Sequence, residues 1–217
     1  MNYYKEPFTK ISQEKRDTIL QAATFEFAER GFDSANINVI AQKAGISVGS
    51  IYKYFGSKED FFLTTIDTGV ETLKSILDGI MGEEKDLMGR IRRIIRAVQT
   101  YSRSDAQLTK LYNEMATESH SELVWKIVSD MEGATAGRYA DMIGEAKEAG
   151  ILREGIDTRL FAFFLDNLFI LLQFSYACEY YKERLKLYVD ENVLGQDDLV
   201  EEQLLLFIRG AFLKDGV

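Results

Sequence analysis

The stretch AGISVGSIYKYFGSKEDF, residues 44–61, decides the fold of this chain. Gly45 lies two residues before Ser47 and Gly56 lies directly before Ser57, and each serine precedes a run that can form a helix. Serine commonly caps the start of a helix, and glycine adopts the left-handed conformation that often ends one. The stretch therefore predicts two tight turns, each followed by a helix that starts at a serine.

The residues before Ser47 complete a helix-turn-helix. Asn36 is a good N-cap for a short helix that ends at Gly45, where the chain turns sharply. Ala41 is small enough for this helix and the next to approach closely, and Ile40 and Ile51 fill the space beneath them. A short helix, a glycine-centred turn and a second short helix make up the helix-turn-helix pattern.

The second helix of this pair carries groups that suit nucleic acid, and we expect it to present Val48, Gly49, Lys53 and Tyr54 outward. Gly49 lets a backbone approach closely, Val48 can contact a thymine methyl group, and Asn38 is the best candidate for a base-edge hydrogen bond. Phe55 and Phe61 are expected in the core. Donors for the sugar-phosphate backbone, which position a protein without reading sequence, come from Tyr52, Lys53, Tyr54 and Lys58.

The charge of the chain is unevenly distributed. The formal net charge of −9 argues by itself against a nucleic-acid partner. However, residues 1–62 hold eight basic and eight acidic side chains, so all the excess negative charge lies in the rest of the chain. Residues 36–58 contain three lysines and no acid. The local balance is therefore compatible with DNA, although the average is not.

The whole chain of 217 residues has one proline, Pro7, and no convincing β pattern, which indicates an all-α fold. We expect an N-terminal helix-turn-helix domain over residues 1–60 and a helical domain over residues 61–217, joined by a long shared helix that starts at Ser57. The first helix is expected over 12–31. The later helices are expected near 84–103, 105–118, 120–149, 157–189 and 197–213.

A cytoplasmic location is expected from several features. Cys178 is the only cysteine, which excludes an intramolecular disulfide, and the first residues lack the apolar region of a signal peptide. The most apolar segment, LFAFFLDNLFILLQFSYAC, contains Asp166, Asn167 and Gln173, which would be costly in lipid. We interpret this segment as a buried helix and expect no membrane contact.

Residues 31–61, GFDSANINVIAQKAGISVGSIYKYFGSKEDF, resemble the DNA-binding region of the tetracycline-repressor (TetR) family of transcriptional regulators. IAQKAGIS, GSIYxYF and SKEDF occur in the family's order and spacing. Val39 and Val48 depart from the polar residues common in the family, so no operator sequence follows. The resemblance implies DNA contacts at Asn36, Asn38, Ser47, Val48, Gly49, Ser50, Tyr52, Lys53, Tyr54 and Lys58.

The same resemblance implies a homodimer formed through the last two helices and an effector pocket in the C-terminal domain. Nine aromatic residues between positions 161 and 188 must face a core, a partner or a ligand. Asn167 shares a helical stripe with some of them, and we hypothesise that it points into a cavity for a small, mostly apolar effector. The residues expected to line this cavity are Tyr101, Tyr112, Met115, Trp125, Phe163, Asn167, Ile170 and Phe174.

The sequence offers little for catalysis. His120 is the only histidine, and no metal-ligand spacing, phosphate-binding loop or dinucleotide motif is present. No catalytic residue, metal or cofactor is therefore expected. We interpret the chain as a ligand-responsive, dimeric regulator that binds double-stranded DNA, more readily a repressor than an activator. Two alternatives stay open: a protein-interaction module that uses the helix-turn-helix as scaffold, and a small helical enzyme.

Overall fold

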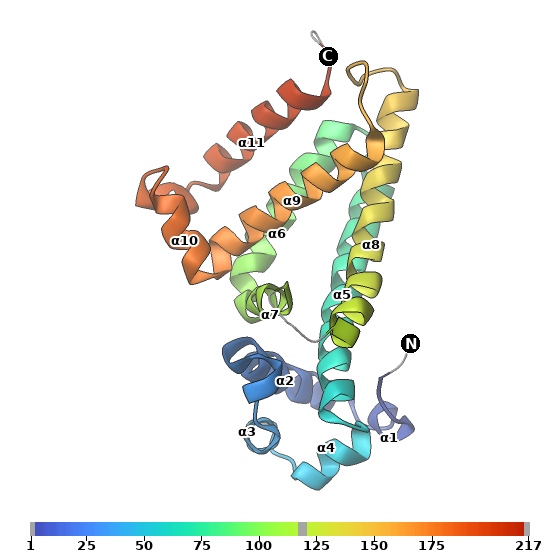
Figure 1. Cartoon of the computed structure of the whole chain (residues 1–217), viewed down its shortest axis with the longest axis vertical. Helices are drawn as coiled ribbons and strands as arrows, with labels where there is room; N and C mark the ends of the chain where they lie inside the picture. Colours follow the sequence, from blue (N-terminus) through green and yellow to red (C-terminus); the bar gives the residue numbers. More distant parts are fainter. Residues whose placement is uncertain (1–2, 117–120, 215–217) are drawn as a thin grey trace. The chain divides into compact units, whose positions relative to one another are not determined.

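The computed structural model describes residues 3–116 and 121–214 (Figure 1). The chain forms two compact units. Unit 1 contains residues 1–71 and 107–130, and unit 2 contains residues 72–106 and 131–217. The expected division at residue 60 did not foresee that residues 107–130 group with the N-terminal part of the chain.

The described residues are helical, apart from turns and two isolated bridges, Tyr4–Phe55 and Leu152–Leu213, which confirms the all-α fold class. The helices, in chain order, are α1 (Glu6–Thr9), α2 (Gln13–Ser34), α3 (Ile37–Lys43), α4 (Val48–Tyr54), α5 (Lys58–Glu83), α6 (Leu87–Ser104), α7 (Ala106–Ala116), α8 (Ser121–Glu148), α9 (Thr158–Ala177), α10 (Glu179–Lys186), the short 3-10 helix η1 (Glu191–Gly195) and α11 (Asp197–Phe212).

An aromatic core holds unit 1 together. Phe55 and Phe61 are fully buried and stack with their ring centroids 4.2 Å apart. Phe27 of α2 meets Phe61 edge-on at 6.0 Å, and Phe8 of α1 packs on Phe55 at 4.9 Å. Offset and edge-to-face ring pairs add to the stabilisation from buried area. The core placement predicted for Phe55 and Phe61 is therefore confirmed.

The core of unit 2 is aliphatic and forms where α6 meets its neighbours. Ile91, Ile94 and Ile95 of α6 are almost completely buried, together with Leu165 of α9 and Ile208 of α11. The helix α6 packs along α9 and α11, as Figure 1 shows. Ile94 and Ile95 lie three and four residues after Ile91, which places all three on one face of α6. This apolar face is the one that the helix turns inward.

The segment predicted as one helix over 157–189 is two helices, so that prediction is wrong. The chain breaks at Cys178, whose backbone is extended with φ −101° and ψ 128°. Neither glycine nor proline marks this break. The ring of Phe174 lies 5.1 Å from that of Tyr181, so side-chain packing supports the change of direction. The last helix, expected over 197–213, is confirmed as α11.

The helix α9 is long and apolar enough to cross a membrane by length and composition alone, with a mean hydropathy of 1.6. A core helix of a globular protein passes the same test, and Asp166, Asn167 and Gln173 lie inside this one. Only 33% of its most apolar window is buried within the chain. The interpretation of α9 as a buried helix is therefore only partly met, and its exposed apolar face requires an explanation.

Candidate nucleic-acid interface

The turn between α3 and α4 has the geometry that the sequence predicts. Gly45 adopts φ +64°, the left-handed conformation that glycine reaches without a steric cost. The Ile46 N–H donates to the carbonyl of Ala41 over 3.0 Å, and the Gly45 N–H donates to the carbonyl of Gln42 over 3.2 Å. These two bonds make a Schellman motif, which closes α3 and directs the chain into α4.

Side-chain caps start both helices of the motif. The Asn36 side-chain oxygen accepts from the N–H of Asn38 at 2.9 Å, and also from the Asn38 side-chain amide at 3.0 Å. The Ser47 hydroxyl accepts from the N–H of Ser50 at 3.1 Å. Capping bonds of this kind satisfy amide groups that have no partner inside the helix. Asn36 and Asn38 are exposed, and the bond between their side chains uses only one of the two amide N–H groups of Asn38.

The structure leaves six of the ten predicted DNA contacts exposed. Tyr52 is 45% exposed, which is unusual for a tyrosine on a short helix of a packed domain. A Cβ atom at Gly49 would meet only the Ser47 hydroxyl, at an ordinary 3.7 Å, so the chain itself does not require glycine there. Asn36, Asn38, Ser47, Gly49, Tyr52 and Lys53 are exposed, whereas Val48, Ser50 and Lys58 are partly buried.

Tyr54 does not face outward, so that part of the prediction is wrong. Its exposed fraction is 7%, and its ring packs 5.8 Å from Phe8 and 6.4 Å from Phe55. The short helix α1, which the sequence reasoning did not predict, supplies Phe8 and covers this side of α4. The helix α4 has one buried side, through Ile51 and Tyr54, and one exposed side, through Tyr52 and Lys53.

The three lysines of the acid-free stretch differ in their availability. The Lys43 ammonium lies 3.6 Å from the Glu26 carboxylate and 3.9 Å from the centre of the Phe25 ring. The Lys58 ammonium donates to the carbonyl of Asp33 over 2.9 Å. Within the described residues, Lys53 alone of the three makes neither a hydrogen bond nor an ion pair through its side chain. Lys53 is therefore the cation most available to a phosphate.

The sequence reasoning missed Lys5, which lies against the end of α4. Its N–H donates to the carbonyl of Tyr54 over 2.7 Å, and its ammonium donates to the carbonyl of Tyr52 over 3.0 Å. A cation at a helix C-terminus is favourable because the last carbonyls carry partial negative charge. No motif in the sequence marks Lys5, because its partner is a backbone group far along the chain.

The residues predicted to hold an effector are divided between the two units. Tyr112 and Met115 belong to unit 1, and the side chain of Trp125 lies outside the described residues. The amide of Asn167 donates to the carbonyl of Phe163 over 2.7 Å, one turn earlier on the same helix. This bond gives one N–H of the Asn167 amide a partner within α9. Unit 2 holds Tyr101, Phe163, Asn167, Ile170 and Phe174.

These side chains differ in exposure. Phe163 is 61% exposed and Phe174 is 4% exposed, although both were expected on one cavity wall. Tyr101 is also exposed, and Ile170 is partly buried. Across the described residues, no group of three or more histidine, cysteine, aspartate or glutamate side chains is arranged to hold a metal. His120 lies outside the described residues.

A closed helix-turn-helix with an exposed tyrosine and a free lysine on its second helix defines a DNA-binding transcriptional regulator. Comparison with known sequences agrees. Residues 19–65 match the sequence model of the family described as "Bacterial regulatory proteins, tetR family". Residues 19–65 therefore carry the DNA-binding region of TetR-family transcriptional regulators, which this chain resembles.

Curated relatives extend over most of the chain. The chain is 24% identical over 166 residues to an uncharacterized HTH-type transcriptional regulator, YhgD of Bacillus subtilis, covering 76% of this chain and 86% of that protein. It is also 24% identical over 212 residues to the HTH-type transcriptional repressor KstR2 of Mycobacterium tuberculosis, covering 94% of this chain and 95% of that protein. Both relatives are named as transcriptional regulators.

Solved structures share the fold. FadR of Bacillus subtilis, crystallised in complex with stearoyl-CoA, is 20% identical and has a TM-score of 0.71. The match covers 87% of this chain and 97% of that one. At this level of identity, the similarity establishes the helical architecture and not the ligand.

Proposed function

We propose that this protein is a dimeric, cytoplasmic repressor that binds a roughly palindromic operator and is released by a small, mostly apolar effector. The observation that carries the proposal is the exposed side of α4. Tyr52 and Lys53 stand free there, on a helix whose start is capped by Ser47 and whose end is bonded to Lys5. A rigid helix that presents a phenol and an unpaired cation is suited to a groove of DNA.

Dimerisation through α9 and α11 is supported by their exposed apolar faces. On α9, Leu160, Phe163, Phe164 and Leu171 recur at helical spacing, and on α11 Leu199, Leu206 and Phe207 do the same. Large apolar side chains gathered on one face mark an interaction surface. A second copy of the same two helices would cover both faces. We therefore propose that Phe163 contacts the partner chain rather than an effector.

A two-fold dimer determines the form of the operator. Each α4 helix would enter a major groove, and the two half-sites would lie about one helical turn of DNA, roughly 34 Å, apart or a multiple of it. The operator should then have palindromic halves. The net charge of −9 gives the protein little general affinity for DNA, so sequence-selective contacts carry more of the binding.

The mostly apolar effector is supported by relatives. KstR2 of Mycobacterium tuberculosis is titled a ketosteroid transcriptional regulator, and FadR was crystallised with stearoyl-CoA. Both molecules have a large hydrocarbon part. In this chain, we propose that Tyr101, Ile170 and Phe174 of unit 2 contribute to effector binding.

The helix α5 is the element by which an effector would act on DNA binding. It begins at Lys58, directly after the helix-turn-helix, and runs to Glu83, so it belongs to both units. An effector shifts the operator affinity only if it binds one conformation of the protein better than another. Equal effector affinity for the free and the DNA-bound protein would exclude this mechanism.

Fluorescence anisotropy on DNA flanking the protein's own gene tests the proposal. The protein is titrated onto this duplex and onto a scrambled one, at two salt concentrations, and the titration is repeated with Tyr52→Ala. Tyr180→Ala is the matched control, because Tyr180 is 74% exposed on α10, outside the helix-turn-helix. We expect selective binding that Tyr52→Ala weakens and Tyr180→Ala leaves unchanged.

A genome-wide selection supplies the operator if it lies elsewhere. Failure to select any DNA would overturn the repressor function and favour the protein-interaction module. For the effector, stearoyl-CoA and coenzyme A alone are compared as probes of the selected complex. Release by the acylated molecule only would support an apolar effector, and release by neither would exclude long-chain acyl thioesters.

A further inference from the structure

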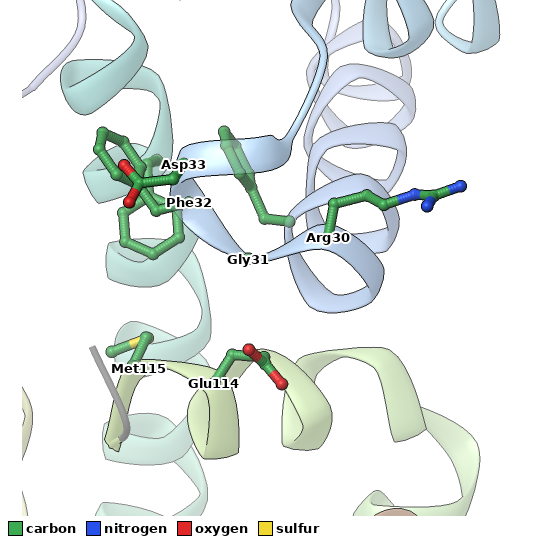
Figure 2. Close-up of a pocket in the computed structure, with 8 residues that line it drawn as sticks. Arg30, Gly31, Phe32, Asp33, Glu114 and Met115 are labelled. Atoms are coloured by element: carbon green, nitrogen blue, oxygen red, sulfur yellow. The ribbon is translucent and has the colours of Figure 1, made fainter. Parts of the chain in front are cut away.

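Unit 1 contains a cavity of about 210 Å³ (Figure 2), and Met115 is the one residue of its lining that the sequence predicted to contact DNA or effector. It lies between the C-terminal end of α2 and the last turns of α7. For scale, an engineered cavity of about 150 Å³ binds benzene. The cavity in unit 1 is therefore large enough for a molecule with one ring.

The walls of the cavity are aromatic. Phe27 of α2 and Phe62 of α5 meet edge-on, with ring centroids 4.9 Å apart, and both are buried. The ring of Phe32 lies 5.0 Å from that of Phe62. Met115 of α7, 6% exposed, completes the apolar lining. The faces of aromatic rings carry partial negative charge and attract cations.

Gly31 opens this space. Its φ of +69° interrupts α2, so that Phe32 and Asp33 leave the line of the helix. A Cβ atom at this position would lie 3.7 Å from the Glu114 carboxylate. Figure 2 shows Gly31 on one side of the opening, with Glu114 and Met115 on the other. A side chain on residue 31 would therefore occupy the mouth.

The charged groups at the mouth are carboxylates. Asp33 and Glu114 are exposed and line the cavity from α2 and α7. Arg30 also belongs to the lining, but Figure 2 shows its guanidinium directed away from the opening. A ligand in the cavity thus meets two acids beside aromatic side chains. An anion would be repelled, and a neutral ring would make no use of the acids.

We propose that this cavity binds a small organic cation, such as a single-ring ammonium or quaternary ammonium compound. The cationic group would lie between the Glu114 and Asp33 carboxylates and the faces of Phe32 and Phe62. The apolar part of the ligand would fill the space beside Phe27 and Met115. This site uses α2, α5 and α7 within unit 1, and no effector residue of unit 2 belongs to its lining.

An ion pair keeps the two walls of the cavity together. The Lys110 ammonium of α7 lies 3.1 Å from the Glu29 carboxylate of α2. The hydrogen bond from Lys110 lowers the pKa of Glu29, and a further hydrogen bond from Gln107 acts in the same direction. Asp33 lies one turn after Glu29 on α2, and Glu114 lies one turn after Lys110 on α7. The frame is therefore formed before any ligand enters.

Occupancy of the site would reach the DNA-binding residues. The carbonyl of Asp33 accepts from the Lys58 ammonium, which also lies 5.3 Å from the centre of the Phe32 ring. A cation on Phe32 would compete with Lys58 for the same ring and repel its charge. This link to operator affinity rests on the proposed function, whereas binding of the cation does not.

Titration with phenyltrimethylammonium tests the site without DNA. The probe is followed by the methyl resonance of Met115, assigned with Met115→Leu among the six methionines of the chain. Benzyl alcohol and benzoate are the neutral and anionic comparisons. We expect a saturable shift with the cation only. Glu114→Gln should weaken binding about three- to tenfold, since it removes charge at nearly constant shape.

Glu14→Gln is the matched control, because it makes the same charge change in the first turn of α2, far from the cavity. It should leave the affinity unchanged. The proposal is overturned if benzyl alcohol binds as tightly as the cation, if Met115 does not shift, or if Glu114→Gln has no effect. Because Glu114 is exposed, its variants should fold, and Glu114→Lys, which should abolish binding, gives a second test.

The same titration on the operator complex separates the two proposals. A protein that binds phenyltrimethylammonium but no DNA would overturn the repressor function and retain this site. A protein that binds the operator with an affinity unaffected by saturating cation would remove the link through Lys58. If the cation lowers the operator affinity of the wild type but not that of Glu114→Lys, the result would support both the repressor function and the cation site.

Discussion

The ammonium of Lys5 donates a hydrogen bond to the carbonyl of Tyr52, and the backbone N–H of Lys5 bonds to the carbonyl of Tyr54. These two bonds join the N-terminal segment to the last turn of the helix that presents Tyr52. Residues 47 positions apart in the sequence are thereby linked. The position of the exposed tyrosine thus depends on a segment that contains no recognisable motif.

Lys5→Ala should weaken operator binding roughly threefold, because the loss of one hydrogen bond lets the end of α4 fray. Lys10→Ala is the control, because Lys10 is also exposed and forms an ion pair with Glu6 within the N-terminal segment. Anisotropy measures the affinity, and circular dichroism checks the fold. Equal affinities for the two variants would show that Lys5 does not position α4.

Lys53→Gln should reduce the dependence of operator affinity on salt. Each phosphate contact releases counterions, so the slope of log K against log salt should fall by about two for a dimer that loses both lysines. Lys85→Gln, an exposed lysine in the loop before α6, should leave the slope unchanged. The measurement is anisotropy at four salt concentrations, and an unaltered slope for Lys53→Gln would remove it from the interface.

Two glycines of the helix-turn-helix should respond differently to alanine. Gly45→Ala introduces a side chain at φ +64° and should cost about 1–2 kcal/mol of folding stability. Gly49→Ala meets no crowding inside the chain and should keep or slightly raise stability. If DNA approaches Gly49 closely, the second variant should nevertheless bind the operator less tightly. Chemical denaturation and anisotropy together separate the two effects, and unchanged affinity in Gly49→Ala would place DNA elsewhere.

Phe207→Glu should abolish the proposed dimer. The side chain is 63% exposed in the protomer, so the protomer itself should fold, but a charge would be buried in the dimer. Sedimentation should show half the mass, and operator affinity should fall more than about a hundredfold because two half-sites no longer act together. Tyr188→Glu, 76% exposed after α10, is the control and should stay dimeric. A dimeric Phe207→Glu protein would contradict the assignment of this face.

Asp166 should make stability depend on pH. Burial raises its pKa to about 7, and the Glu132 carboxylate on α8 adds to the shift, whereas the unfolded value is about 3.9. Between about pH 4 and pH 7 the native state therefore holds a proton that the unfolded state has lost, so stability falls as pH rises across this range and levels off above it. Asp166→Asn should be more stable than wild type at pH 8, by on the order of 2 kcal/mol, and by less at pH 5.5.

Denaturation at both pH values measures this difference. Asp141→Asn, an exposed acid of α8, serves as the control and should show no comparable change. A constant difference between Asp166→Asn and wild type at the two pH values would mean that Asp166 does not titrate in this range.

Much of the helix-turn-helix could be predicted because its signals are local. Gly45, Ser47 and Asn36 act on residues within a few positions, so the sequence shows both the residue and its partner. The buried side of α4 could not be predicted in the same way. Whether Tyr54 faces solvent depends on Phe8, which reaches it from another helix.

The C-terminal half shows the same limit. The periodicity of residues 157–189 predicts one helix, but the chain bends at Cys178, where packing of Phe174 against Tyr181 replaces any local breaker. The sequence also did not show that the amide of Asn167 donates to the carbonyl of Phe163 within its own helix. An apolar helix pattern indicates that one face of the helix is buried, but it does not identify the side chains that pack against that face.

The sequence by itself determined the all-helical fold and the helix-turn-helix, because short-range capping, turn chemistry and helical periodicity depend on neighbouring residues. Only the tertiary structure decided that Lys53 is free while Lys43 and Lys58 are engaged, that Tyr54 is buried, and that α2 and α7 enclose a cavity. Each of these depends on groups brought together from distant positions, and such contacts arise from packing, which no local pattern encodes.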